Sequence, residues 1–144
     1  MKALFLSFLL AASACYAADE ICPRRVVVPG YPRLARMARL QGSVSVQIEI
    51  ASDGRVVSAQ ASGTDRLLER AAEDNIRHWT FSPARPPGSS TSSRATVTYI
   101  YRLDGQEVYY DPPPRVALDL PNRVEITSQP PMPQPTPTDA GRRK

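Results

Sequence analysis

One strand pattern constrains this 144-residue sequence more than any other feature. Across residues 43–50, polar and apolar side chains alternate without interruption, which is typical of a half-buried β-strand. The apolar members are Val44, Val46, Ile48 and Ile50. Asp53 and Gly54 follow, and an Asp-Gly pair between two strand patterns is a strong hairpin signal. Residues 55–61 are therefore the expected return strand.

A short amphipathic helix is expected before this hairpin, within residues 29–40. Pro32 suits the first helical turn, where its missing N–H is not needed. The residues expected to form the apolar face are Leu34, Met37 and Ala38, and those expected on the other faces are Arg33, Arg36 and Arg39. Gly42 ends the segment.

A second amphipathic helix is expected after the hairpin. Residues 62–64 break the strand pattern, and Thr64 is the expected N-cap with Asp65 in the first turn. Apolar residues then recur every three or four positions, at Leu68, Ala72, Ile76 and Trp79. Phe81 and Pro83 end this helix.

The last strand pattern of the folded body covers residues 95–103, which are rich in β-branched and aromatic side chains. Beyond Asp104 the pattern fades, and nine of the 15 prolines lie between residues 112 and 137. Proline cannot donate to a sheet ladder, and the last thirty or so residues are too polar to fold alone. We therefore expect residues 105–144 to be a mostly disordered tail, with residues 115–126 as the part that could instead lie across the domain.

The N-terminus has the three parts of a secretory signal peptide: a positive end, an apolar run and small residues. Cleavage after Ala17 would leave a short segment, residues 18–28, before the domain at residues 29–104. Two alternatives stay open. The small residues before Cys15 resemble a lipoprotein processing site, and the charge-free stretch from Ala3 to Ala18 could stay as a short anchor, although a membrane span needs about 20 residues. Each places the body of the protein outside the cytoplasm, in the periplasm.

Composition argues against several functions. The net charge of +4 is interspersed, without the basic face that nucleic-acid binding requires. Two cysteines and one histidine are too few for the usual four-ligand Cys/His zinc site. No nucleophile stands in a recognisable catalytic arrangement. We therefore expect no metal, no cofactor and no enzymatic activity.

Several motifs, taken in order and spacing, resemble the C-terminal domain of the TonB energy transducers. They run from the start of the first helix to the end of the second, and the resemblance covers residues 29 to about 104. The residues that carry it are expected to be structural: Tyr31, Pro32, Gly42, Asp53, Gly54, Trp79, Phe81 and Pro83.

The resemblance implies an α+β fold, a three-stranded antiparallel sheet with the helices packed on one face. It also implies a role in energy-coupled transport across the cell envelope. TonB domains bind a short extended segment, the TonB box, of an outer-membrane transporter, which adds itself to the sheet edge. The ExbB and ExbD proteins supply the coupling to the proton gradient.

The peptide-binding strand that we predict is the last one, which carries no proline and only one charge. An unprotected edge strand can accept an extended peptide by β-augmentation. The predicted site residues are Ala95, Thr96, Val97, Thr98, Tyr99, Ile100, Tyr101, Arg102 and Leu103. The alternative is that this edge is covered, by the tail or by a second copy in a homodimer.

Three features depart from the family pattern. The link between the apolar segment and the domain is about a dozen residues, which reach at most roughly 40 Å. The proline-rich stretch follows the domain instead of preceding it, and the apolar segment lacks the His that the family's anchor helix pairs with a Ser.

We therefore expect a periplasmic binding module for an extended segment of an envelope protein. A shortened energy transducer with ExbB/ExbD-like partners, and a structural envelope protein or lipoprotein that binds peptidoglycan, stay open as alternatives.

Overall fold

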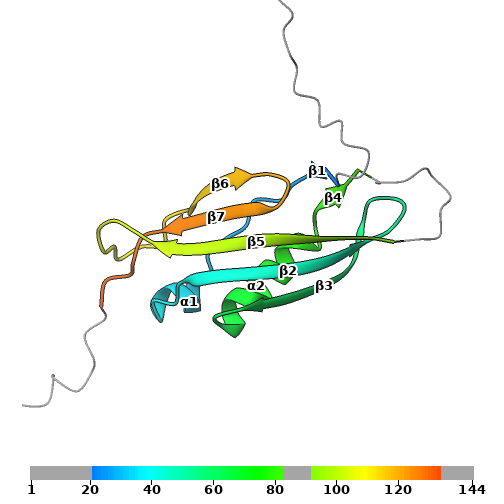
Figure 1. Ribbon diagram of the computed structural model, residues 1–144. Coiled ribbons are helices and arrows are strands. Elements are labelled where there is room, and N and C mark those ends of the chain that lie inside the picture. Colours follow the sequence, from blue (N-terminus) through cyan, green and yellow to red (C-terminus); the bar gives the residue numbers. More distant parts are fainter. Residues whose placement is uncertain (1–20, 83–91, 134–144) are drawn as a thin grey trace, which may run out of the picture.

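The computed structural model describes residues 21–82 and 92–133, which form two sheets and two helices (Figure 1). A five-stranded sheet has the order β3-β2-β5-β7-β6, and a small second sheet pairs β1 with β4. The α+β class and the helices on one face of the sheet are confirmed, but the expected number of three strands is wrong. Neither helix in these two ranges is long and apolar enough to cross a membrane.

The predicted hairpin is present as β2 (Gly42–Ile50) and β3 (Val56–Gly63), which pair antiparallel. The turn is closed by two backbone hydrogen bonds, from Ala51 N–H to the Arg55 carbonyl and from Gly54 N–H to the Ala51 carbonyl, both 2.9 Å. The Asp53 carboxylate accepts from the Arg55 backbone N–H at 3.0 Å, and this bond lowers the pKa of Asp53. The Asp-Gly pair thus acts as a turn, as predicted.

The strand β5 (Ser93–Leu103) pairs antiparallel with the other side of β2. Alternation places Val44, Val46, Ile48 and Ile50 of β2 in the core, at 0–2% exposure. The core therefore lies between the sheet and the helices, and the opposite face of the sheet is polar. Other buried core residues from β5 and the helices are Ala35, Leu68, Ala72, Ile76, Val97, Tyr99 and Tyr101.

The expectation of a disordered tail is wrong for part of residues 105–144. β6 (Arg115–Asp119) and β7 (Arg123–Ser128) form an antiparallel hairpin, and β7 pairs parallel with β5. Val124 and Ile126 of β7 are 0% exposed. Burying two such side chains contributes about 1.5–3 kcal/mol each, which offsets the ordering of a polar, proline-flanked segment.

The helix α2 (Arg66–Ile76) buries the predicted stripe of Leu68, Ala72 and Ile76. Two details of its ends differ from the prediction. The N-cap is Asp65, whose carboxylate accepts from Leu67 N–H at 2.7 Å, and not Thr64. The helix ends before Trp79, and Phe81 lies in β4 (Thr80–Phe81), which pairs with β1 (Pro23–Arg25). Pro83 lies outside the described residues.

The helix α1 (Arg33–Met37) follows Pro32 as predicted but turns a different face inward. Leu34 and Met37 are 65% and 51% exposed, whereas Arg36 is only 4% exposed. The predicted apolar face is therefore wrong. The physical reason is a set of polar partners for the guanidinium of Arg36, described below.

A buried polar network joins the N-terminal segment, α2 and β5. Trp79 Nε1 donates to the Val27 carbonyl at 3.1 Å and to Asn75 Oδ1 at 3.0 Å. Asn75 Nδ2 donates to the same Val27 carbonyl at 3.0 Å, and the Tyr99 hydroxyl donates to Asn75 Oδ1 at 2.9 Å. Since unpaired buried polar groups are costly, this network fixes how the helix sits on the sheet.

The turn glycine gives the first testable prediction. Gly54 has φ +88°, and a Cβ there would lie 2.1 Å from the Phe81 carbonyl oxygen. We expect Gly54→Ala to lower the free energy of unfolding by about 2–4 kcal/mol, through backbone strain and loss of this close approach. Urea unfolding followed by Trp79 fluorescence measures the change.

The matched control is Gly30→Ala, because a Cβ on Gly30 meets nothing within 4 Å. This variant should stay within about 0.5 kcal/mol of the parent. Equal effects of the two substitutions would contradict the assignment of strain to residue 54.

Candidate functional site

The predicted peptide-binding strand, residues 95–103, lies within β5, but β5 is not an edge of the sheet. β2 pairs with one side of it and β7 with the other (Figure 1). The parallel ladder matches residues 98–103 of β5 with residues 123–128 of β7. The prediction of an open edge here is therefore wrong, and the alternative that the chain's own C-terminal part covers this edge is confirmed.

Backbone hydrogen bonds join β5 and β7 at both ends of the ladder. Thr98 N–H donates to the Asn122 carbonyl at 2.8 Å, and Asp104 N–H donates to the Ser128 carbonyl at 2.9 Å. β5 itself begins at Ser93, five residues before the first residue that β7 covers. The β7 side of β5 thus accepts a parallel strand along its second half.

The two faces of β5 differ in chemistry. Val97, Tyr99 and Tyr101 point into the core, at 0–1% exposure. Burial raises the pKa of Tyr31 to about 12 and also raises the pKa values of Tyr99 and Tyr101. On the opposite face, the side chain of Arg102 is exposed and lies 3.3 Å (Nε to Oε1) from Glu125 of β7.

The buried hydroxyls are not equally satisfied. Tyr31 OH donates to the Leu40 carbonyl, and its ring packs edge-on against Tyr101 with centroids 5.4 Å apart. Within the described residues, Tyr101 OH, Ser128 Oγ and Arg36 Nε are buried side-chain atoms that have no hydrogen-bond partner. The contact between β7 and the core is thus apolar in part and leaves polar atoms unpaired.

The far edge of β3 is closed by two side chains of α2, Glu69 and Glu73, and by that of Arg77, which caps the helix. Glu73 Oε1 accepts from Ala61 N–H at 2.8 Å, and Glu69 Oε1 accepts from Gly63 N–H at 2.9 Å. Arg77 Nη2 donates to the Ala59 carbonyl at 3.4 Å. These contacts use the backbone groups that an incoming strand would need, so we do not place a peptide here.

The other outer strand is β6, which is five residues long. Pro112, Pro113 and Pro114 precede it and Pro121 follows it, while Arg115 and Asp119 carry charges at its ends. Short length, flanking proline and charge are the features that protect an edge from pairing. β6 is consequently a poor acceptor for a peptide.

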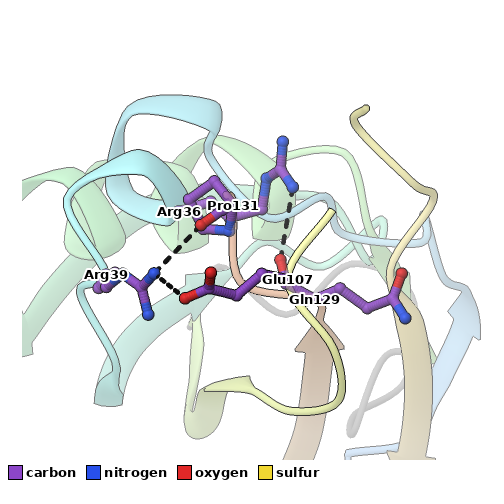
Figure 2. A network of polar contacts seen from close by, with 5 residues as sticks. All are labelled: Arg36, Arg39, Glu107, Gln129 and Pro131. Atoms are coloured by element: carbon purple, nitrogen blue, oxygen red, sulfur yellow. Dashed lines mark hydrogen bonds and ion pairs between the residues drawn. The ribbon is translucent and has the colours of Figure 1, made fainter. Parts of the chain in front are cut away.

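Two arginines of the α1 region hold the base of the β6–β7 hairpin (Figure 2). Arg36 Nη2 pairs with Asp111 at 3.0 Å, while its Nη1 donates to the carbonyls of Tyr110 at 3.3 Å and Gln129 at 3.4 Å. Arg39 pairs with Glu107 and donates to the Pro131 carbonyl at 3.2 Å. We call Arg36, Arg39 and these partners the arginine clasp. It joins the segment before β6 to the segment after β7.

A depression of about 390 Å³ lies beside the clasp, lined by Arg33, Arg36, Arg39, Tyr109 and Met132 among others. In residues 21–82 and 92–133, no three His, Cys, Asp or Glu side chains are grouped in a way that could hold a metal ion. Cys15, the lipidation site in the lipoprotein alternative, lies outside these ranges.

Comparison with known proteins decides the family. The model of the family described as "Gram-negative bacterial TonB protein C-terminal" matches residues 27–103, more than half of the chain. This chain belongs to the TonB C-terminal family. The match contains β2, β3, β5 and both helices, and it ends twelve residues before β6 begins at Arg115.

Relatives named Protein TonB support this assignment. The Pseudomonas aeruginosa protein is 30% identical over 88 residues, 60% of this chain and 26% of the relative, and the Xanthomonas campestris protein is 31% identical over 90 residues, 61% and 40% respectively. The solution structure of the P. aeruginosa TonB C-terminal domain superposes with a TM-score of 0.50 at 30% identity, covering 65% of this chain and 95% of that one. The chain thus spans about a quarter to two fifths of these full-length relatives.

The TonB motif residues have structural positions in the fold. Tyr31, Trp79 and Phe81 are in the core, and Phe81 N–H donates to the Gly54 carbonyl at 2.8 Å. Gly42 has φ +151°, and a Cβ there would meet Thr64 Oγ1 at 2.1 Å. The motif therefore secures the hairpin and the helix end.

The sequence interpretation missed β7 and the arginine clasp. A signal for β7 existed: Val124 and Ile126 alternate with polar residues, and Pro121-Asn122 before them suits a turn. The polar, proline-rich composition of residues 105–144 nevertheless led to the expectation of disorder there. For the clasp no local signal exists, because Arg36 and its partner Asp111 are 75 residues apart.

The second prediction concerns two buried hydroxyls of β5: that of Tyr99 has a hydrogen-bond partner and that of Tyr101 has none. Tyr99→Phe removes the bond to Asn75 and should lower the free energy of unfolding by about 1–2 kcal/mol. Tyr101→Phe removes a buried hydroxyl that has no partner, so it should be neutral or slightly stabilising. Urea unfolding of both variants at pH 7 measures the difference, and a larger loss from Tyr101→Phe would contradict it.

Proposed function

We propose that this chain is a TonB-like binding module of the cell envelope. It binds an extended segment of an outer-membrane transporter by taking it up as a strand of its sheet, in energy-coupled transport. The binding position is the β7 side of β5, residues 93–103.

The single observation that supports this position is the parallel ladder between β5 and β7. β7 lies outside the residues that the family model matches, and its pairing shows that this side of β5 can accept a parallel strand. The edge of β3 is closed by α2, and β6 is short and flanked by proline. The side of β5 is therefore the position with the geometry and the length to accept a segment.

The expected binding is weak and reversible. Each backbone hydrogen bond contributes a net of about 0.5–1.5 kcal/mol. A ladder of a few bonds, with two apolar side chains, offsets only part of the roughly 4–15 kcal/mol cost of association. Micromolar to millimolar dissociation constants follow, as suits a contact that must be released in each transport cycle.

The third prediction tests this binding. Titrating the ¹⁵N-labelled full chain with synthetic TonB-box peptides should shift the amide resonances of residues 93–103, whereas those of β3 (Val56–Gly63) should move little. A peptide of the same composition in scrambled order is the control. Because β7 occupies the position in the native chain, the titration includes a variant with β7 loosened, Val124→Ser/Ile126→Ser. Shifts absent from both proteins at millimolar peptide would contradict the proposed function.

Coupling to energy requires a further link. We infer that ExbB/ExbD-like partners act on this chain only if residues 1–17 stay as a membrane anchor. A chain cleaved after Ala17 would bind its partner in the periplasm without such coupling, and a chain acylated on Cys15 would act close to one membrane.

The fourth prediction addresses this point. The intact mass of the protein from fractionated cells should correspond to a soluble form that begins at Ala18, as the signal-peptide pattern indicates. A membrane fraction that retains residues 1–17 would instead support the anchored transducer. An added mass of acyl chains on Cys15 would support the lipoprotein.

A further inference from the structure

We propose that the depression beside the arginine clasp is a binding site for a small organic acid, one that combines an apolar body with a single carboxylate. Its volume of about 390 Å³ lies at the lower end of the range of small-molecule pockets, about 300–1,000 Å³. Its lining comes from the α1 region and from residues 108–109 and 131–133, not from β5. The inference therefore does not rest on the proposed function.

The walls of the depression are bonded to one another. Val108 N–H donates to the Pro130 carbonyl, and Met132 N–H donates to the Val108 carbonyl, both at 3.0 Å. The arginine clasp joins these two segments to Arg36 and Arg39 (Figure 2). The site is thus formed before a ligand arrives, as is usual for small-molecule pockets.

Part of the lining is apolar and reaches solvent. Met37 of α1 is 51% exposed and Tyr109 is 78% exposed, while Val108 and Met132 are half-buried. Apolar side chains that gather at the surface commonly mark a binding site. Methionine and aromatic side chains also adapt to the shape of a ligand. This part of the lining can therefore hold an aromatic ring or a short aliphatic chain.

The charges of the lining favour a monoanion. Arg36 and Arg39 pair with Asp111 and Glu107, respectively. Arg33 is exposed, and its side chain makes no hydrogen bond or ion pair with the residues that the structure describes. The lining and its ion-pair partners thus carry three guanidinium groups against two carboxylates, an excess of one positive charge.

Arg36 is an independent indication of an anion. It lines the depression but is only 4% exposed, and within the described residues its Nε has no hydrogen-bond partner. The bonds of its Nη1 to the carbonyls of Tyr110 and Gln129, at 3.3 and 3.4 Å, are longer than the usual range of about 2.7–3.2 Å. Because water screens a buried guanidinium little, its field reaches an anion held beside it.

These features together define the class of ligand. The planar fork of a guanidinium matches a carboxylate, and Arg33 has its donors free for one. A dianionic phosphate ester would meet repulsion from Glu107 and Asp111 of the clasp. Five of the nine lining residues lie beyond the residues that the family model matches, so membership of the TonB family does not imply this site.

The test, our fifth prediction, is an NMR titration of the ¹⁵N-labelled full chain. The two probes are phenylacetate and its uncharged analogue phenylacetamide, which have the same apolar body. Both should shift the amide resonances of Arg33, Met37, Tyr109 and Met132, and those of β3 should move little. We expect phenylacetate to bind with a dissociation constant of about 1–10 mM, about five-fold more tightly than the amide.

Surface variants separate the charged and apolar contributions. Arg33→Gln should remove the advantage of phenylacetate and leave the affinity for the amide unchanged, whereas Arg66→Gln, an exposed arginine of α2, should change neither. Tyr109→Ser should weaken both probes about three-fold, and its control is Val57→Ser, which is 60% exposed on β3. These side chains are exposed, so the variants should keep the dispersed amide spectrum of the native chain.

Equal affinities of the native chain for phenylacetate and phenylacetamide would overturn the inference, as would equal losses from Arg33→Gln and Arg66→Gln. Tighter binding of phenyl phosphate than of phenylacetate would contradict the assignment to a monoanion. A tripeptide Ala-Ala-Phe with a free C-terminus that bound ten-fold more tightly than phenylacetate would contradict a small acid as the occupant and indicate the end of a protein chain. None of these outcomes affects the proposed function, which concerns β5.

Discussion

The fold is organised by one constraint: every strand at the side of a sheet has backbone N–H and C=O groups that need partners. The family domain has two such sides, on β3 and on β5. On β3, side chains of α2 (Glu69 and Glu73) and of its C-cap residue Arg77 bond to the outward-facing backbone groups. A strand covers the second, and one strand can be exchanged for another. This asymmetry supports the proposed binding position on β5.

The elements that depend on short stretches of sequence were predictable. The alternation across residues 43–50 and the Asp53-Gly54 turn determine β2 and β3, and the spacing from Leu68 to Ile76 determines α2. These elements and the order of the motifs were sufficient for the family. The burial of Arg36 was not predictable, because it depends on Asp111 and on two carbonyls near residues 110 and 129, which only the folded chain brings together.

The strand β7 shows a different limit. Its alternating pattern is readable, but its partner lies about 25 residues earlier, on the far side of a proline-rich connection. For this segment, composition predicts disorder whereas the local pattern predicts a strand. The segment forms a strand because Val124 and Ile126 are buried in the core. The same burial changed the interpretation of the site. Residues 95–103 are readable from the sequence as a strand, but whether that strand is a free edge depends on β7, which lies in the tail.

Exchange of β7 for a partner strand conserves most of the backbone hydrogen bonds, so side chains and connectivity decide which strand wins. Connectivity favours β7, since a segment tethered to the same chain has an effective concentration in the millimolar range. A free peptide of equal fit would therefore need a millimolar concentration to occupy much of the site. A transporter segment held near the module by its own membrane protein would gain a comparable advantage, and the unpaired hydroxyls at Tyr101 and Ser128 leave room for a better fit. At the proposed position, the hairpin would favour tethered partners over peptides that diffuse freely.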